Sequence, residues 1–184
     1  GDIVVEDIVG ALGVGQVVSQ SGSIRLATRD VTNSGDESIL LSNGGVLRAL
    51  QGDITLWSGD DVILAAAASI SAGGVVRIEG DHGKADAASL GATLDLRGAI
   101  RASTVALQTG LAADKVVLAQ VLADTTLNTG DNNDWIRVGS QATLSSNTLG
   151  LLDSVRAHLE VQGGAGVDRL DLDDSGGSDA NDCV

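Results

Sequence analysis

The sequence predicts an all-β protein built as a parallel β-solenoid, on three observations. Short aliphatic segments alternate apolar side chains with other residues at a period of two, as strands with one buried face do. Gly, Asp, Asn and Ser separate these segments along the chain, as turns between strands require. Proline is absent and only two residues are aromatic, which suits a narrow interior of stacked Val, Ile, Leu and Ala.

The expected strands follow one another along the chain. They lie at residues 23–26, 38–41, 53–56, 75–78, 92–96, 135–138, 158–161 and 169–172. Their spacing is uneven, so we expect irregular coils decorated by loops. Coils of roughly 20–25 residues would give on the order of eight in this chain. No linker or shift in composition divides the sequence, and residues 1–184 are therefore expected to form one solenoid domain.

Three segments depart from the strand pattern. Residues 111–124 and 147–158 place apolar side chains at helical spacing, so each is open to a short helix or a loop. Residues 65–68 are successive alanines, which would also suit a helix. Because strand-like residues flank the alanines on both sides, we interpret them as strand and corner residues in a tight interior.

Several features of the sequence limit the classes of protein to which the chain can belong. The chain begins at Gly1 and contains no methionine, so we expect a fragment of a longer protein. The single cysteine, Cys183, excludes an internal disulfide. The longest uncharged run, residues 8–24, is too polar to span a bilayer, and no membrane insertion is expected.

The charge of the chain comes almost entirely from aspartate. The net charge is −14, with 21 Asp against four Glu and only two lysines. Such a surface does not neutralise phosphates, which argues against nucleic-acid binding. Aspartate suits turns and calcium ligation. An acidic, lysine-poor composition is also common on exported proteins, and we expect a secreted or cell-surface location.

Residues 163–171 carry the sharpest local motif. They read Gly-Gly-Ala-Gly-Val-Asp-Arg-Leu-Asp and fit every fixed position of the nonapeptide G-G-x-G-x-D-x-U-x, where U is apolar. In that motif, carbonyls of the glycine turn and the aspartate carboxylate face an ion. A degenerate copy spans residues 129–137, and a fainter one ends at Ile63. Calcium candidates are therefore Asp131, Asp134 and Asp168, with a plain Gly-Asp turn as the alternative.

A second calcium candidate overlaps the first. Residues 171–182 align with the twelve-residue loop D-x-D-x-[DNS]-G-x5-[DE]. The acidic residues at its ligand positions are Asp171, Asp173, Asp179 and Asp182. The alternative is an acidic, frayed tail over residues 173–184. If calcium binds, we expect it first in this C-terminal stretch, through Asp168, Asp171, Asp173 and Asp179 with backbone carbonyls of the turn at residues 163–166. It would order the end without being needed for the fold.

These motifs resemble two groups of known proteins. The glycine-aspartate turns resemble those of the RTX family, although RTX copies are tandem and here the two better copies start 34 residues apart. Phrases such as GDITLWSGDDVILAAAASISAGG and NTGDNNDWIRVGS resemble repeats of giant bacterial secreted adhesin-like proteins of filamentous-haemagglutinin and autotransporter type. That resemblance implies a right-handed, single-stranded parallel β-helix, secretion to the cell surface, and adhesive or fibre-forming roles.

Two function classes follow. The first is a non-catalytic structural or adhesive module, whose partners are neighbouring modules of the same protein or identical subunits stacked end to end. The alternative is a β-helix that binds or cleaves an extracellular glycan. Its carboxylates and arginines would share one external face: Asp60, Asp61, Asp81, Asp95, Arg97 and Arg101.

Catalytic signals are otherwise sparse. Neither His82 nor His158 has a metal-ligand partner at suitable spacing, and no G-x-S-x-G motif occurs. We therefore expect no enzyme. Trp57 and Trp135 each adjoin a Gly/Asp turn, which makes them candidate contacts for a sugar or a partner; packing against a corner is the alternative.

Overall fold

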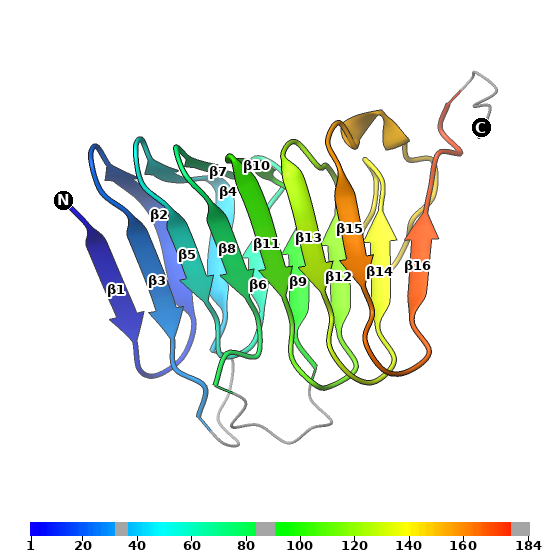
Figure 1. Ribbon diagram of the computed structural model, residues 1–184, viewed down its shortest axis with the longest axis horizontal. Coiled ribbons are helices and arrows are strands. Elements are labelled where there is room, and N and C mark those ends of the chain that lie inside the picture. Colours follow the sequence, from blue (N-terminus) through cyan, green and yellow to red (C-terminus); the bar gives the residue numbers. More distant parts are fainter. Residues whose placement is uncertain (32–36, 84–90, 178–184) are drawn as a thin grey trace.

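The computed structural model describes residues 1–31, 37–83 and 91–177. The protein is all-β, as predicted: two parallel sheets face each other, and the chain passes repeatedly between them (Figure 1). Strands β1 and β16 lie at opposite ends of the stack. Within the described part of the chain, no helix has the length and hydrophobicity that crossing a membrane requires.

The first sheet contains seven strands, each parallel to its neighbours. In spatial order they are β1 (Ile3–Asp7), β3 (Ile24–Thr28), β5 (Ile54–Trp57), β8 (Val76–Glu79), β11 (Thr104–Gln108), β13 (Asp124–Asn128) and β15 (Leu159–Gln162).

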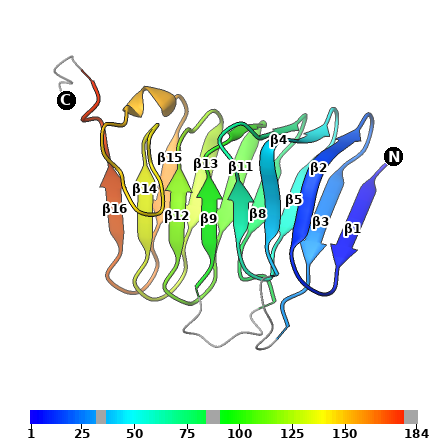
Figure 2. The ribbon, with the colours of Figure 1, turned by 180° about the vertical axis from the view of Figure 1, so that it is seen from behind.

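The second sheet, seen in front in Figure 2, contains nine strands. In spatial order they are β10 (Ala99–Arg101), β7 (Ser69–Ala72), β4 (Ile39–Ala49), β6 (Val62–Leu64), β9 (Thr93–Leu96), β12 (Lys115–Leu118), β14 (Trp135–Val138) and β16 (Arg169–Leu172), with β2 (Leu12–Ser19) also paired to β4. The long strand β4 joins two ladders, because residues 39–41 pair with β6 and residues 46–49 pair with β7.

Alternate residues of each strand point between the sheets and form rows of buried aliphatic side chains. Neighbouring strands are in register, so each side chain stacks on a similar one in the next strand. This arrangement buries apolar surface without aromatic bulk, which explains the composition. Two rows come from the first sheet and two from the second: Ile24, Ile54, Val76, Val105; Leu26, Leu56, Ile78, Leu107, Leu127; Ile39, Val62, Leu94, Val116, Ile136; and Leu41, Leu64, Leu96, Leu118, Val138.

The rows are uncovered at both ends of the described stack. Leu170 and Leu172 of β16 continue two rows of the second sheet, yet they are 47% and 54% exposed. Val5 of β1 continues a row of the first sheet and is 37% exposed. Among the described residues, no strand pairs with the outer edges of β1, β15 or β16.

The segments with helical spacing adopt different structures. Residues 111–124 contain strand β12, because Val116 pairs with Leu94 on one side and Ile136 on the other. Residues 147–158 contain a single 3₁₀ turn, η1 (Leu152–Ser154). The four alanines at 65–68 form the corner between β6 and β7, as predicted, but none lies in a strand, and Ala66 and Ala67 are exposed and not in the interior.

The acidic segment after β16 is held by hydrogen bonds as far as it is described. The Asp174 carboxylate accepts the Leu152 N–H at 2.9 Å, and the Ser175 hydroxyl accepts the Leu149 N–H at 2.9 Å. Residues 178–184 lie outside the described residues. Residues 173–177 therefore lie against the loop that precedes η1.

Candidate functional site

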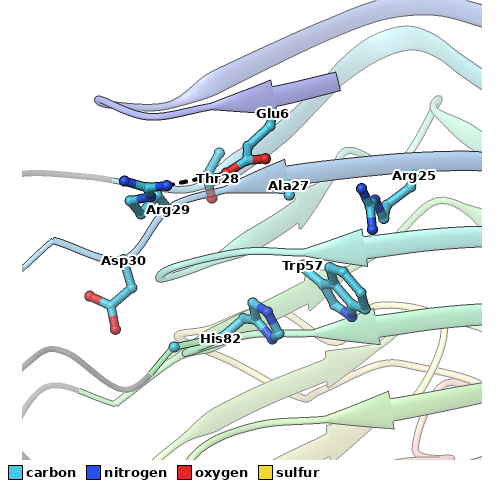
Figure 3. A pocket seen from close by; sticks show the side chains of 9 residues that line it. Glu6, Arg25, Ala27, Thr28, Arg29, Asp30, Trp57 and His82 are labelled. Carbon is cyan, nitrogen blue, oxygen red and sulfur yellow. Dashed lines mark ion pairs between the residues drawn. The ribbon is translucent and has the colours of Figure 1, made fainter. Parts of the chain in front are cut away.

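A pocket of about 310 Å³ opens on the outer face of the first sheet (Figure 3). Strand register creates it: Glu6, Ala27 and Trp57 occupy one row across β1, β3 and β5. The small side chain of Ala27 leaves space between its two larger neighbours. The pocket is lined by Glu6, Arg25, Ala27, Thr28, Arg29, Asp30, Trp57, His82 and Gly83.

Trp57 and His82 form one wall of the pocket. Their rings are stacked, with centroids 4.8 Å apart and planes 5° from parallel. The His82 backbone N–H donates to the Ser58 carbonyl at 2.7 Å, which ties the turn after β8 to the end of β5. His82 Nδ1 lies 3.1 Å from Glu79 Oε1, and this contact orients the imidazole.

The charged residues of the pocket are two arginines and two carboxylates. Arg29 pairs with Glu6 at 3.7 Å, and both side chains are mainly exposed. The Arg25 guanidinium carbon lies 5.3 Å from the Trp57 ring centroid. Exposed ion pairs and cation–π contacts of this kind contribute little stability. These charges therefore remain accessible to a ligand.

Trp135 lies in a different environment, at the start of β14 in the second sheet. The guanidinium carbons of Arg137 and Arg169 lie 3.7 Å and 5.2 Å from its ring centroid. Arg137 is buried, and its Nη1 donates to the Thr143 carbonyl at 2.8 Å. Arginines therefore lie over Trp135, which favours the packing interpretation for this residue.

A second polar feature is a row of carboxylates at the turns that lead into the second sheet. Each carboxylate accepts a backbone N–H from the neighbouring turn, at 2.7–3.1 Å. We call it the aspartate row. In each pair, the backbone N–H of the first residue donates to the carboxylate of the second: Glu37 to Asp60, Ala92 to Asp114, Asp114 to Asp134, and Asp134 to Asp168.

The central members of the aspartate row are buried. Asp114 and Asp134 are 1% and 2% exposed, and burial raises the pKa of both carboxyls, that of Asp114 to about 6. Repulsion from Asp134 and Asp81 adds to the rise at Asp114, while hydrogen bonds from Thr109 and the Ala92 N–H oppose it. The row therefore ties the turns together at an electrostatic cost at neutral pH.

The two better nonapeptide copies stack directly on each other, although they lie 34 residues apart in sequence. The Asn133 side-chain oxygen accepts the Val167 N–H at 2.7 Å. Gly164 has φ +73°, and a Cβ there would lie 1.8 Å from the Gly130 carbonyl oxygen. Close approach of the two turns therefore requires the glycine, for a reason that involves no ion.

Alanine at position 164 should destabilise the last turn by about 1–2 kcal/mol, since an L side chain disfavours this φ and the methyl overlaps Gly130. Hydrogen exchange should show faster exchange of the β16 amides in Gly164→Ala. Gly13→Ala is the control, because Gly13 has open space around it and no positive φ. Unchanged exchange in Gly164→Ala would contradict the close packing of the two turns.

The structure separates the predicted calcium ligands near the C-terminus. Asp168 and Asp173 flank the four-residue strand β16, which holds them roughly 16 Å apart at about 3.3 Å per residue. Asp171 Oδ2 lies 3.4 Å from Arg169 and 3.7 Å from Arg137. Hydrogen bonds from Ser175 and the Gly150 N–H lower the pKa of Asp173. One ion therefore cannot contact both Asp168 and Asp173.

The other calcium candidates lie in turns or outside the described residues. Asp134 belongs to the aspartate row, and Asp131 is exposed in a bridge to Ala165. Asp179 and Asp182 lie outside the described residues. No group of three His, Cys, Asp or Glu side chains within residues 1–31, 37–83 and 91–177 could hold a metal ion. Calcium binding at these aspartates stays a prediction from the sequence.

The carboxylates suggested for glycan cleavage have structural contacts. Asp60 and Asp61 accept the backbone N–H groups of Glu37 and Thr93, at 2.7 Å and 2.6 Å. Asp95 is buried in the second sheet and lies 3.0 Å from Arg97. Burial raises the pKa of Asp95, and the Arg97 charge opposes the rise. These carboxylates orient turns or pair with arginine.

Comparisons with protein-family models, curated proteins and solved structures found no similar protein. The resemblance to adhesin-like repeats therefore depends on the sequence motifs alone. Of the candidate residues predicted from sequence, only Trp57 lines the pocket. His82, Arg25 and Arg29 carried no local signal, because their proximity depends on strand register.

Proposed function

We propose that the chain is a right-handed parallel β-helix that serves as a non-catalytic structural or adhesive module of a large secreted or cell-surface protein. The observation that carries this proposal is the core left uncovered at both ends of the described stack. Val5, Leu170 and Leu172 lie in core rows but are exposed. A further coil of the same kind would bury them.

The topology supports both the handedness and the scaffold role. The chain returns repeatedly from one parallel sheet to the other, with β6 and β7, and likewise β9 and β10, following one another in the second sheet. Crossovers between parallel strands are almost always right-handed. Each coil packs mainly on the coils before and after it, as in repeat proteins that act as extended scaffolds. The backbone groups at the edges of β1 and β16 are available to pair with another strand.

The partners we propose are neighbouring coils of the same protein or an identical subunit stacked end to end. Sedimentation velocity over a range of concentrations should show the chain associating into linear oligomers. Leu172→Lys should weaken this association, because a charge would replace an exposed residue of the core row. Leu149→Lys is the matched control, since Leu149 is 73% exposed but lies in the loop before η1. A strict monomer at high concentration would contradict end-to-end stacking.

Carbohydrate binding is a second candidate function, favoured by the pocket at Trp57. Small-molecule sites combine an apolar or aromatic surface with a few polar groups, and the stacked Trp57 and His82 rings provide that surface here. Cleavage would require two carboxylates about 5–10 Å apart that are available for acid–base chemistry. Of the two carboxylates in the pocket, Glu6 is paired with Arg29. We therefore propose binding rather than cleavage.

A further inference from the structure

We propose that the pocket at Trp57 binds an acidic saccharide, and that Arg25 binds its carboxylate. The inference rests on carbohydrate binding as the candidate function and specifies the ligand class. It depends on three properties of the pocket: its size, its unpaired positive charge and its aromatic wall.

The size of the pocket suits a short stretch of saccharide. Its volume of about 310 Å³ lies at the small end of the range for ligand sites, roughly 300–1,000 Å³. Ala27 sets this volume, because a larger side chain would fill the gap between Glu6 and Trp57. Among the described residues, the pocket opens on the outer face of the first sheet, so a longer glycan can extend beyond it.

One arginine of the pocket, Arg25, favours an anionic ligand. Acidic residues outnumber basic ones in the chain by 25 to 11, yet Arg25 makes no ion pair with a carboxylate among the described residues. Its contact is the Trp57 ring, at 5.3 Å. A guanidinium matches the planar, two-oxygen geometry of a carboxylate. Arg29, which follows the end of β3, also lines the pocket, but its guanidinium is paired with Glu6 at 3.7 Å.

The remaining groups favour a sugar over a simple anion. The stacked rings of Trp57 and His82 offer an apolar surface for the C–H groups of a sugar ring. The carboxylate of Glu6 lines the pocket, and its oxygens can accept hydrogen bonds from the hydroxyl groups of a sugar. An ion such as acetate or phosphate would use Arg25 but not the aromatic wall or the Glu6 carboxylate.

A matched pair of glycosides tests the ligand class. Methyl β-glucuronide and methyl β-glucoside differ only in the carboxylate, and Trp135→Phe leaves Trp57 as the sole tryptophan reporter. Fluorescence titration should show about tenfold tighter binding of the glucuronide, the effect expected of a hydrogen-bonded charge. Ligand-observed NMR on the unmodified chain repeats the comparison without the background substitution.

Two pairs of variants test which residues of the pocket bind the ligand. Arg25→Gln should remove the preference for the glucuronide, while Arg48→Gln, an exposed arginine of the second sheet, should leave it intact. Ala27→Leu should abolish binding of both glycosides by filling the pocket. Ala106→Leu is its control, because Ala106 is exposed on the outer face of β11, away from the pocket.

The outcomes separate the two levels of the proposal. Equal affinity for both glycosides would overturn the acidic class and leave carbohydrate binding in place. Binding of neither glycoside by the folded chain would overturn carbohydrate binding as well. Acetate or phosphate that binds as tightly as the glucuronide, with no loss in Ala27→Leu, would show a simple anion site and overturn the saccharide.

Discussion

Leu96→Ala should lower the free energy of unfolding by about 2–5 kcal/mol, the range for removing a buried leucine side chain. Leu96 is 1% exposed and stacks between Leu64 and Leu118 in the second sheet. Neighbouring strands hold the backbone on both sides, so the cavity cannot close by a local shift. Chemical denaturation followed by circular dichroism measures the change.

Leu172→Ala is the matched control, because Leu172 ends the same row and is 54% exposed. Its truncation removes little buried surface, and the loss should stay below about 1 kcal/mol. Equal losses in the two variants would contradict the assignment of Leu172 to an uncovered end. A small loss for Leu96→Ala would contradict the burial of the row itself.

Asp114→Asn should stabilise the protein by up to about 3 kcal/mol at pH 8 and flatten the pH dependence of its stability. The pKa of Asp114 is raised from 3.8 to about 6, first by burial. The asparagine side-chain oxygen can still accept the Ala92 N–H that Asp114 accepts at 2.7 Å. The substitution therefore keeps the hydrogen bond and removes the buried charge.

The direction of the pH effect follows from proton binding. Between pH 3.8 and about 6, the folded chain binds a proton at Asp114 that the unfolded chain has released. Stability therefore falls as pH rises through this window, and the penalty is complete above it. The raised pKa of Asp134 adds to the same trend. Thermal unfolding of the wild type and Asp114→Asn between pH 4 and 8 measures the difference.

Asp168→Asn provides the control for the aspartate row. Asp168 accepts the equivalent backbone hydrogen bond, from Asp134, but is exposed, so removal of its charge should change stability little. If Asp114→Asn were less stable than the wild type at pH 8, the Asp114 charge would be compensated in the folded protein. A chelator titration would then show whether a cation supplies that compensation.

The all-β class and eight of the sixteen described strands could be predicted from the sequence. Ile54 and Leu56 alternate with polar neighbours, and that alternation selects the buried face whichever strand lies beside it. The same pattern was present but not recognised in β11 and β13, where Val105 and Leu107, then Thr125 and Leu127, alternate with exposed residues. Residues 111–124 extend from beyond β11 to the start of β13, and their apolar side chains at helical spacing made the period-two alternation on either side harder to identify.

Contacts between turns and between outward-facing side chains could not be predicted from the sequence. The pocket combines residues from three neighbouring strands of the first sheet and from the turn after the next strand. Glu6, Ala27 and Trp57 lie on β1, β3 and β5, and His82 lies in the turn after β8. The buried charge of Asp114 likewise depends on turns above and below it. Side-chain alternation is local, because it follows from the geometry of one strand. Register between strands depends on loops of unequal length and on packing of the whole stack, so residues that share a row cannot be matched from their spacing in the sequence.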